Sequence, residues 1–253
     1  YHSQFFFVLQ EKTANTLFHT LSQREKAEIL SIPLDYPFMK NEEKLTMIER
    51  FKQHAGVKEI LLSDVGYMQG MSGNGLTTEK GNENSWIDIS VMAVPANFFS
   101  FMNILMEQGR LPQTEKDIVV DNVWQEMQKK DVIGMNLYSG NTDYTICGIS
   151  TPFQADVYNR SSGYAFLPYN SSVYIGHCYI KSHPGQQKEV AQWIEKVCHE
   201  MLPENITYQA KTFLDDIHVS QALEYNLKDI ILFFAVISII ITLLGVYLSL
   251  IHI

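Results

Sequence analysis

The sequence predicts an α+β protein with two lobes, followed by a C-terminal transmembrane helix. Three observations lead to this prediction. Residues 230–251 form an apolar run without a charged side chain. A β-rich stretch at about residues 84–165 separates two outer regions, in which helices alternate with strands. The outer regions can pair as one split βαβ lobe, and the β-rich stretch then forms an inserted lobe.

The chain accordingly divides into three parts. Residues 1–40 form a membrane-proximal N-terminal segment, residues 41–227 the two-lobed core, and residues 228–253 the transmembrane helix. The apolar run is long enough to span a membrane, because a helix of that length rises roughly 33 Å and a bilayer core is about 30 Å thick. Only Lys228 lies close before the run, so basic residues do not fix its orientation.

The two ends of the chain lead us to expect an internal piece of a longer membrane protein. Phe5–Leu9 is apolar but too short to span a bilayer, and it fits either the end of a preceding helix or a strand. At the other end, His252 and Ile253 follow the apolar run directly.

The first region begins with a short helix at Ser22–Leu30, after which Pro33 breaks the chain. A longer helix starts at Asn41, whose side chain suits an N-cap, and stops near Gly56. A strand follows at Val57–Val65. The apolar stripe of the longer helix is predicted to consist of Leu45, Ile48, Phe51 and Ala55.

A glycine-rich loop is predicted at Tyr67–Asn84. Glycines of this kind can cradle a phosphate group, but no Gly-Lys-Ser or Gly-Lys-Thr follows them, and no strand leads into a helix here. The segment therefore indicates a surface loop rather than a nucleotide site.

The β-rich stretch alternates short strands with short helices. Its predicted elements are a strand at Trp86–Val94, a short helix at Ala96–Met106, a turn at Gly109–Arg110, a strand at Asp117–Val120, a helix at Val123–Lys130 with Asn122 as its N-cap, and a hairpin of Met135–Tyr138 with Tyr144–Ile149.

Beyond this stretch, strands are predicted at Gly163–Tyr169, Val173–Ile180 and Ile206–Lys211. An amphipathic helix at Gln186–Leu202 separates the second of these strands from the third. Its buried face is predicted to consist of Val190, Trp193, Ile194, Val197, Met201 and Leu202.

The last helix begins at Thr212 and is expected to continue into the apolar run. No Pro or Gly lies between Thr212 and Leu244, so nothing in the sequence breaks it. Within the run, Ser238, Thr242 and Gly245 are small residues at about one-turn spacing. Such residues either pack closely against a partner helix or are neutral in lipid.

Composition excludes some classes of function. The formal net charge is −9 and no basic stripe occurs, which argues against a nucleic-acid partner and mildly favours an extracytoplasmic domain. The three cysteines, Cys147, Cys178 and Cys198, include no CxxC pair and are too few for a disulfide-rich fold. We expect buried free thiols at Cys178 and Cys198, while a single disulfide bond stays open in an oxidising compartment.

No catalytic, cofactor-binding or metal site is expected. His177-Cys178 and Cys198-His199 look like metal-ligand pairs, but adjacent residues on a strand point to opposite faces, and neither pair has structural-zinc spacing. Neither a Gly-x-Ser-x-Gly elbow nor a His-Glu-x-x-His motif occurs. The neighbouring residues Asp215 and Asp216 suit the first turn of a helix better than a catalytic pair.

An ordered series of motifs marks the centre of the chain. The series consists of Gly109-Arg110-Leu111, acidic Glu115 and Asp117, Ile118-Val119-Val120, Asp131-Val132-Ile133-Gly134-Met135 and Tyr144-Thr145-Ile146-Cys147-Gly148-Ile149. With this series, the chain from about Asn41 to Leu248 resembles the MacB-like periplasmic core domain of FtsX-family ABC transporter permeases.

The resemblance implies a two-lobed domain outside the cytoplasmic membrane, held between the first two membrane helices of a permease. It implies no cofactor here, because ATP is bound by a separate or fused subunit, and this chain contains no Walker A motif. The implied partners are that ATP-binding subunit, a second permease subunit in a homodimer or a pair, membrane lipid, and an adaptor or outer-membrane protein. ATP-driven movement would reach the outer domain through the last helix and drive efflux by mechanotransmission.

Two alternatives stay open. A membrane-anchored sensor or adhesion domain would need no transport partner. A membrane-tethered hydrolase predicts a pocket in which a Ser or Cys side chain lies within hydrogen-bonding reach of a His.

Overall fold

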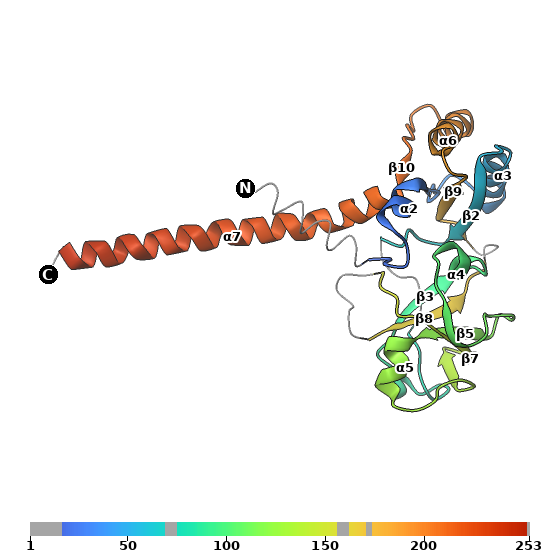
Figure 1. The fold of residues 1–253 in the computed structure, drawn as a ribbon, viewed down its shortest axis with the longest axis horizontal. Helices are drawn as coiled ribbons and strands as arrows, with labels where there is room; N and C mark the ends of the chain where they lie inside the picture. The colour runs from blue at the N-terminus through green and yellow to red at the C-terminus, as the bar shows by residue number, and fades with distance from the viewer. Residues whose placement is uncertain (1–16, 69–74, 156–161, 171–173, 252–253) are drawn as a thin grey trace.

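The computed structural model describes residues 17–68, 75–155, 162–170 and 174–251. These residues form two lobes and one long helix, α7, which projects away from them (Figure 1). The predictions for Phe5–Leu9 and His252–Ile253 lie outside the described residues, as do parts of those for residues 1–40, Tyr67–Asn84 and Val173–Ile180.

The first lobe is built on a four-stranded sheet with the order β10-β1-β9-β2, in which all neighbouring strands are antiparallel. Helix α3 connects β1 to β2, and α6 connects β9 to β10, so each connected pair is parallel and encloses a third strand. This is the predicted split βαβ unit, present twice as in ferredoxin-like folds. The elements of this ferredoxin-like lobe are α2 (Gln23–Glu28), β1 (Ile29–Pro33), α3 (Asn41–Lys52), β2 (Val57–Ser63), β9 (His177–Ser182), α6 (Gln187–Met201) and β10 (Lys211–Thr212).

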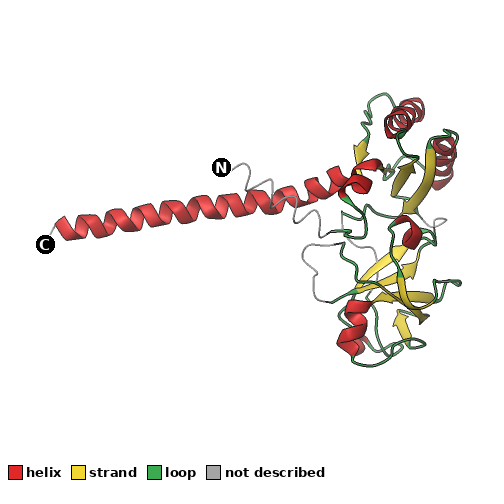
Figure 2. Ribbon diagram, viewed as in Figure 1, coloured by secondary structure: helices red, strands yellow, loops and turns green. Residues whose placement is uncertain are grey.

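The second lobe is inserted between β2 and β9. Its mixed sheet has the order β3-β8-β5-β7-β4, and β6 pairs with the first part of β7. Figure 2 draws the strands of both lobes in yellow. The pairs β3–β8 and β5–β7 are parallel, and the others are antiparallel. The elements of this inserted lobe are η1 (Glu83–Ser85), β3 (Ser90–Val94), α4 (Phe98–Phe101), β4 (Met106–Gly109), β5 (Asp117–Asp121), α5 (Asn122–Gln128), β6 (Asn136–Ser139), β7 (Thr142–Ser150) and β8 (Tyr164–Pro168).

Buried apolar side chains form three clusters. One lies between the ferredoxin-like sheet and helices α3 and α6, and another lies inside the inserted lobe against α5. The third joins the lobes, because Leu61 and Tyr179 of the ferredoxin-like sheet belong to the same cluster as Phe98, Val119 and Phe166 of the inserted lobe. We call this third cluster the lobe interface. All five of these side chains are fully buried.

Helix α7 (Phe213–Ile251) follows β10 without an intervening residue. A capping box closes its start, since Asp215 N–H donates to Thr212 Oγ1 at 3.1 Å and Thr212 N–H donates to Asp215 Oδ2 at 2.8 Å. The helix runs without a break from Phe213 to Ile251, so the predicted continuous helix is confirmed. No membrane-crossing helix is identified among the described residues. The transmembrane assignment of residues 228–253 stays a prediction.

Several predicted elements are confirmed with small shifts of their ends. They are α2, α3, β2, β5, α5, the β6–β7 hairpin, β8, β9 and α6. Two details of α5 and α6 are corrected. The N-cap of α5 is Asp121 rather than Asn122. On α6, Trp193 and Met201 are only partly buried, and Cys198 completes the buried face.

Helix α3 begins where predicted but turns a different face toward the sheet. Its N-cap is Lys40, whose N–H donates to Glu43 Oε2 at 2.8 Å. Asn41 instead accepts a hydrogen bond from Ile175 N–H at 3.3 Å, so the tertiary contact replaces the predicted cap. Leu45 is 39% exposed, which contradicts its place in the predicted stripe. The buried residues of α3 are Lys44, Met47, Ile48 and Phe51, and Ala55 lies beyond the helix.

Regular structure is shorter than predicted in three places. The strand predicted from Trp86 is regular only over β3, and the helix predicted at Ala96–Met106 only over α4. The strand predicted at Ile206–Lys211 is wrong except at Lys211, where β10 begins. The sequence does not predict β1 or β4. Both depend on partners far along the chain, β9 for the first and β7 for the second.

Candidate functional site

Three polar side chains meet where α7 leaves the ferredoxin-like sheet. Ser31 lies on β1, His177 on β9 and Asp216 in the first turn of α7. The Ser31 Oγ atom lies 2.7 Å from His177 Nε2, and the hydroxyl donates a hydrogen bond to Asp216 Oδ2. We call this group the polar junction. It joins the root of the long helix to the two central strands of the sheet.

The number of hydrogen atoms that each side chain can donate fixes the direction of these hydrogen bonds. A serine hydroxyl has one hydrogen, and Ser31 donates it to the Asp216 carboxylate. The Nε2 atom of His177 must then be the donor to Ser31 Oγ, which assigns the neutral tautomer protonated at Nε2. The donors therefore run in one direction, from β9 through β1 to α7.

Burial shapes the protonation of both ends of this chain of donors. Ser31 is 1% exposed and His177 is 4% exposed. Burial lowers the pKa of His177 to about 4, so the imidazole is neutral at pH 7. Burial also raises the pKa of Asp216, and the hydrogen bond from Ser31 and the nearby Lys211 oppose that rise.

Aromatic side chains enclose the polar junction. The ring centroids of Tyr179 and His177 are 4.6 Å apart, and Phe213 meets the Tyr179 ring edge-on at 5.3 Å. Phe18 packs against Phe213 at 4.8 Å. Both Phe213 and Ile217 are fully buried, so the first turn of α7 is embedded in the lobe interface.

The polar junction meets the distance criterion of the hydrolase alternative but not its chemistry. In a Ser-His-Asp triad the imidazole lies between hydroxyl and carboxylate and removes the hydroxyl proton. Here the Ser31 hydroxyl lies between the other two groups, and His177 is its donor. Both Ser31 and His177 are buried from solvent. The arrangement does not supply an accessible nucleophile.

The residue pairs that look like metal ligands separate in the structure. His177 faces the polar junction, whereas Cys178 belongs to the cluster on the opposite face of the sheet, together with Cys198. His199, the neighbour of Cys198, is exposed. Among the described residues, no group of three or more His, Cys, Asp or Glu could hold a metal ion. Cys178 and Cys198 are buried free thiols as predicted, and Cys147 is a third.

The sequence does not reveal the polar junction, because its members are far apart. Ser31 is separated by 146 residues from His177 and by 185 from Asp216. Of the two acidic residues predicted to complement the helix dipole, Asp215 takes the capping position, and Asp216 faces the sheet instead. The available signal was one hydroxyl within the apolar strand β1.

The motifs behind the sequence resemblance hold the inserted lobe together. Gly109 has a φ of 74°, and a Cβ there would lie 2.3 Å from the carbonyl oxygen of Cys147. Arg110 donates two hydrogen bonds to Asp117, of 2.7 and 3.0 Å. The guanidinium also holds the pKa of Asp117 well below its usual range. These residues fix the loop between β4 and β5.

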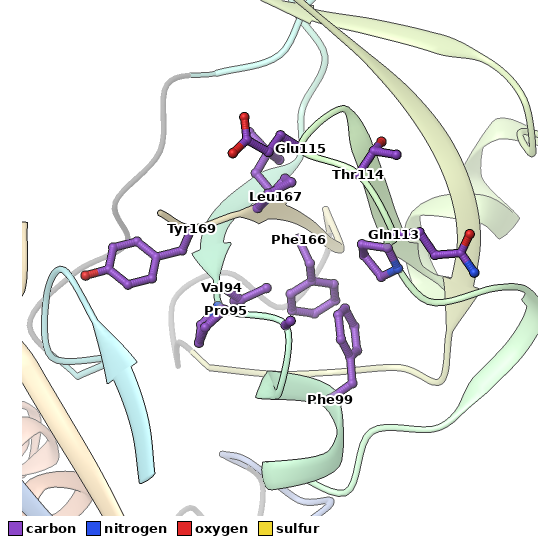
Figure 3. A pocket seen from close by; sticks show the side chains of 12 residues that line it. Val94, Pro95, Phe99, Gln113, Thr114, Glu115, Phe166, Leu167 and Tyr169 are labelled. Carbon is purple, nitrogen blue, oxygen red and sulfur yellow. The ribbon is translucent and has the colours of Figure 1, made fainter. Parts of the chain in front are cut away.

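A small pocket of about 200 Å³ opens at the carboxyl ends of the parallel strands β3 and β8 (Figure 3). Phe99 and Phe166, with ring centroids 5.4 Å apart, line it together with Gln113, Thr114 and Glu115 from the loop before β5. Among the residues that line this pocket, Glu115 is the only charged one. The lining is mainly apolar and presents no nucleophile with a neighbouring base.

The fold is similar to three solved structures. The periplasmic region of MacB from Actinobacillus actinomycetemcomitans gives a TM-score of 0.50 at 12% identity, covering 81% of this chain and 98% of that one. The extracellular domain of the ABC-type transporter YknZ from Gram-positive bacteria gives 0.51 at 14% identity, covering 74% and 99%. A domain assigned to a permease protein from Porphyromonas gingivalis gives 0.52 at 12% identity, covering 74% and 91%.

These similarities establish the fold. No family model matches the chain, and no curated protein matches it. The chain has the fold of a MacB-like periplasmic domain of ABC transporter permeases, as the sequence resemblance implies.

Proposed function

We propose that this chain is the extracytoplasmic domain of an ABC-type permease, and that it couples ATP-driven movement in the cytoplasm to substrate export by mechanotransmission. The similarity to a periplasmic region and to an extracellular transporter domain supports the class of protein. The proposal gives no residue a catalytic, cofactor-binding or metal-binding role, so the chain would act through movement alone.

The direct connection between β10 and α7 carries this proposal. Thr212 pairs with Leu30 of the central strand β1, and the next residue, Phe213, already begins the helix. The polar junction then ties the first turn of α7 to β1 and β9 through Asp216. Because no loop separates the strand from the helix, a tilt of α7 must displace the sheet.

The proposal places the far part of α7 in the cytoplasmic membrane and both lobes outside it. Residues 230–251 contain no charged side chain, and the large apolar residues from Ile230 to Leu244, except the half-buried Ile237, are exposed along the helix. An exposed apolar surface of this size favours lipid or a partner helix as its environment. The hydroxyls of Ser238 and Thr242 donate to carbonyl groups of their own helix, which suits them to lipid.

The proposal also assigns the parts of the chain and its partners. Residues 41–227 would be the extracytoplasmic core with its insertion at about 84–165, preceded by the membrane-proximal segment 1–40 and followed by the membrane helix 228–253. An ATP-binding subunit, separate or fused, would supply the energy. A second permease subunit would complete the transporter, and an adaptor or outer-membrane protein is a further candidate partner.

Purification of the full-length parent protein from native membranes tests the class of protein. We expect a stoichiometric ATP-binding subunit, separate or fused, and ATPase activity. If neither is found, the transport proposal fails and the sensor or adhesion alternative takes its place.

A break in α7 tests the mechanical role. Leu227 is 56% exposed, so Leu227→Ala leaves packing intact, whereas Leu227→Pro removes a helix hydrogen bond and kinks α7. Since the described cysteines are buried, a spin label at Met127→Cys on α5 can report the distance between two subunits. We expect a nucleotide-dependent change of this distance in the wild type and in Leu227→Ala, and none in Leu227→Pro. A full change in Leu227→Pro would exclude α7 as the transmitting element.

A further inference from the structure

We propose that the inserted lobe carries a binding site for a neutral saccharide, centred on the exposed ring of Trp86. The site is a pocket of about 370 Å³, built from residues 75–83, from Trp86 and from the turn of the β6–β7 hairpin. Ligand pockets typically measure about 300–1,000 Å³. The inference goes beyond the proposed function and needs neither ATP nor transport.

Trp86 is both exposed and held in place. Its side chain is 56% exposed, which is unusual for a residue of this size outside an interface or a binding site. The six-membered ring packs directly on the backbone of Gly75, where an added Cβ would lie 1.8 Å from the ring atom Cζ3. A rigid indole loses little conformational entropy when a ligand stacks on it.

The loop that carries the pocket is fixed to the hairpin. Thr77 N–H donates to the Tyr138 carbonyl oxygen and Tyr138 N–H donates to that of Thr77, both at 2.9 Å. Lys80 forms an ion pair with Asp143 at 2.8 Å across the same gap. The two segments of the site therefore keep a fixed spacing before a ligand arrives.

The polar lining consists of hydrogen-bonding groups with little charge. Asn82 is held in a fixed orientation, because its Nδ2 donates to Glu79 and its Oδ1 accepts from Asn84 N–H. Asn141, in the hairpin turn, has no side-chain partner among the described residues, so both ends of its amide can bind a ligand. Glu83 is the only charged residue among those lining the pocket. The absence of a cation in this lining disfavours an anionic ligand.

This combination fits a pyranose ring. One face of such a sugar presents C–H groups, which stack favourably on the negative face of an indole, and its edge presents hydroxyls. Hydroxyls both donate and accept, as the amides of Asn82 and Asn141 do. A cationic side chain of a partner protein could also stack on Trp86 and pair with Glu83, but it would leave the amide oxygen and nitrogen of Asn141 without a specific role.

Binding to an array of neutral bacterial surface glycans, followed by titration of intrinsic fluorescence, tests the proposal on the full chain in nanodiscs. We expect at least one neutral glycan to bind. Trp86→Ala should lower its affinity about tenfold or more. Asn141→Ala, which touches no packing, should lower it about threefold to tenfold. Phe38→Ala serves as the matched control, because Phe38 is 49% exposed on the other lobe and should not affect binding.

Three outcomes would overturn the proposal. The first is that every neutral glycan has the same affinity for the wild type as for the Trp86→Ala variant, when both proteins have the same melting temperature. If Trp86→Ala does not fold, the comparison is made with Asn141→Ala, and unchanged glycan affinity has the same meaning. The third is binding of a lysine- or arginine-rich peptide that depends on Trp86 while no glycan binds, which would identify a protein partner instead.

Discussion

The lobe interface and the polar junction lie on the same face of the ferredoxin-like sheet, but different forces hold them. At the lobe interface, Phe166 packs against Phe98 and Phe153 with ring centroids 5.6 and 5.5 Å apart. At the polar junction, contact depends on hydrogen bonds through Ser31. Apolar burial is non-directional, whereas a hydrogen bond is lost after a small displacement.

This difference indicates where the molecule can move. Lobes joined by a continuous apolar core are expected to move as one body, because separating them exposes that core. The root of α7 is held by the directional hydrogen bonds of the polar junction and also by the buried side chains of Phe213 and Ile217, which belong to the lobe interface. A movement of α7 should therefore carry both lobes together, and the following predictions test that view.

The largest effect is expected for Phe166→Ala. Phe166 is fully buried in the lobe interface, so the substitution should lower the free energy of unfolding by about 3–5 kcal/mol. Chemical denaturation of the full chain measures this, and Phe38→Ala at an exposed site should change little. Two separate transitions in the wild type would contradict the view that the lobes unfold as one body.

A glycine pair inside the inserted lobe gives a smaller effect. Gly109 and Gly134 both have positive φ, of 74° and 81°, but only Gly109 lacks space for a Cβ. Gly134→Ala should cost about 1–2 kcal/mol from backbone conformation alone. Gly109→Ala should cost about 3 kcal/mol or more, because it also meets the Cys147 carbonyl.

Thermal unfolding monitored on the ferredoxin-like lobe is the informative measurement for this pair. If the lobe interface makes unfolding cooperative, Gly109→Ala lowers the transition seen there as well. A change confined to probes of the inserted lobe would show that the lobes unfold separately.

The part of the fold that the sequence predicts is the part with local causes. Helix α6 follows from its apolar periodicity, and α7 follows from the absence of Pro and Gly between Thr212 and Leu244. Strand β4 has no apolar pattern, since three of its four residues are exposed, and only its pairing with β7 creates it. Lys44 reads as a surface residue, yet it is buried because its ammonium donates to the carbonyl of Ile175.

The candidate site was harder to predict for the same reason. A polar junction of three side chains from three elements has no spacing pattern in the sequence. The glycine-rich loop gave a visible signal, but the sequence could not show that Gly75 supports the ring of Trp86. Both features depend on tertiary contacts rather than on local propensity.

At the polar junction, Ser31→Ala is expected to lower the free energy of unfolding by about 1–3 kcal/mol. The substitution leaves the buried His177 Nε2–H and the half-buried Asp216 Oδ2 without their partner. Ser220→Ala, on an exposed face of α7, is the matched control. Equal stability of the two variants would mean that the hydrogen bonds of the junction contribute nothing.

The smallest effect is a pH dependence of stability, which we expect to have opposite signs for His177 at the polar junction and for Asp121 in the inserted lobe. Burial lowers the pKa of His177 from 6.5 to about 4, so its contribution to stability is present above pH 6.5 and is lost as pH falls toward 4. Burial raises the pKa of Asp121, in the inserted lobe, from 3.8 to about 6. Its contribution is present below pH 3.8 and is lost as pH rises through 6.

Melting of the full chain between pH 4 and pH 7 compares His177→Gln with Asp121→Asn. The stability difference between wild type and His177→Gln should grow with rising pH, and that for Asp121→Asn should shrink, each by about 1–2 kcal/mol. Asp216 also has a raised pKa and opposes His177, but it is present in both variants. His183→Gln, at an exposed position, controls for the loss of a histidine. Parallel pH profiles would mean that burial does not shift the pKa values of His177 and Asp121 in opposite directions. The difference between the two regions would then depend on packing alone.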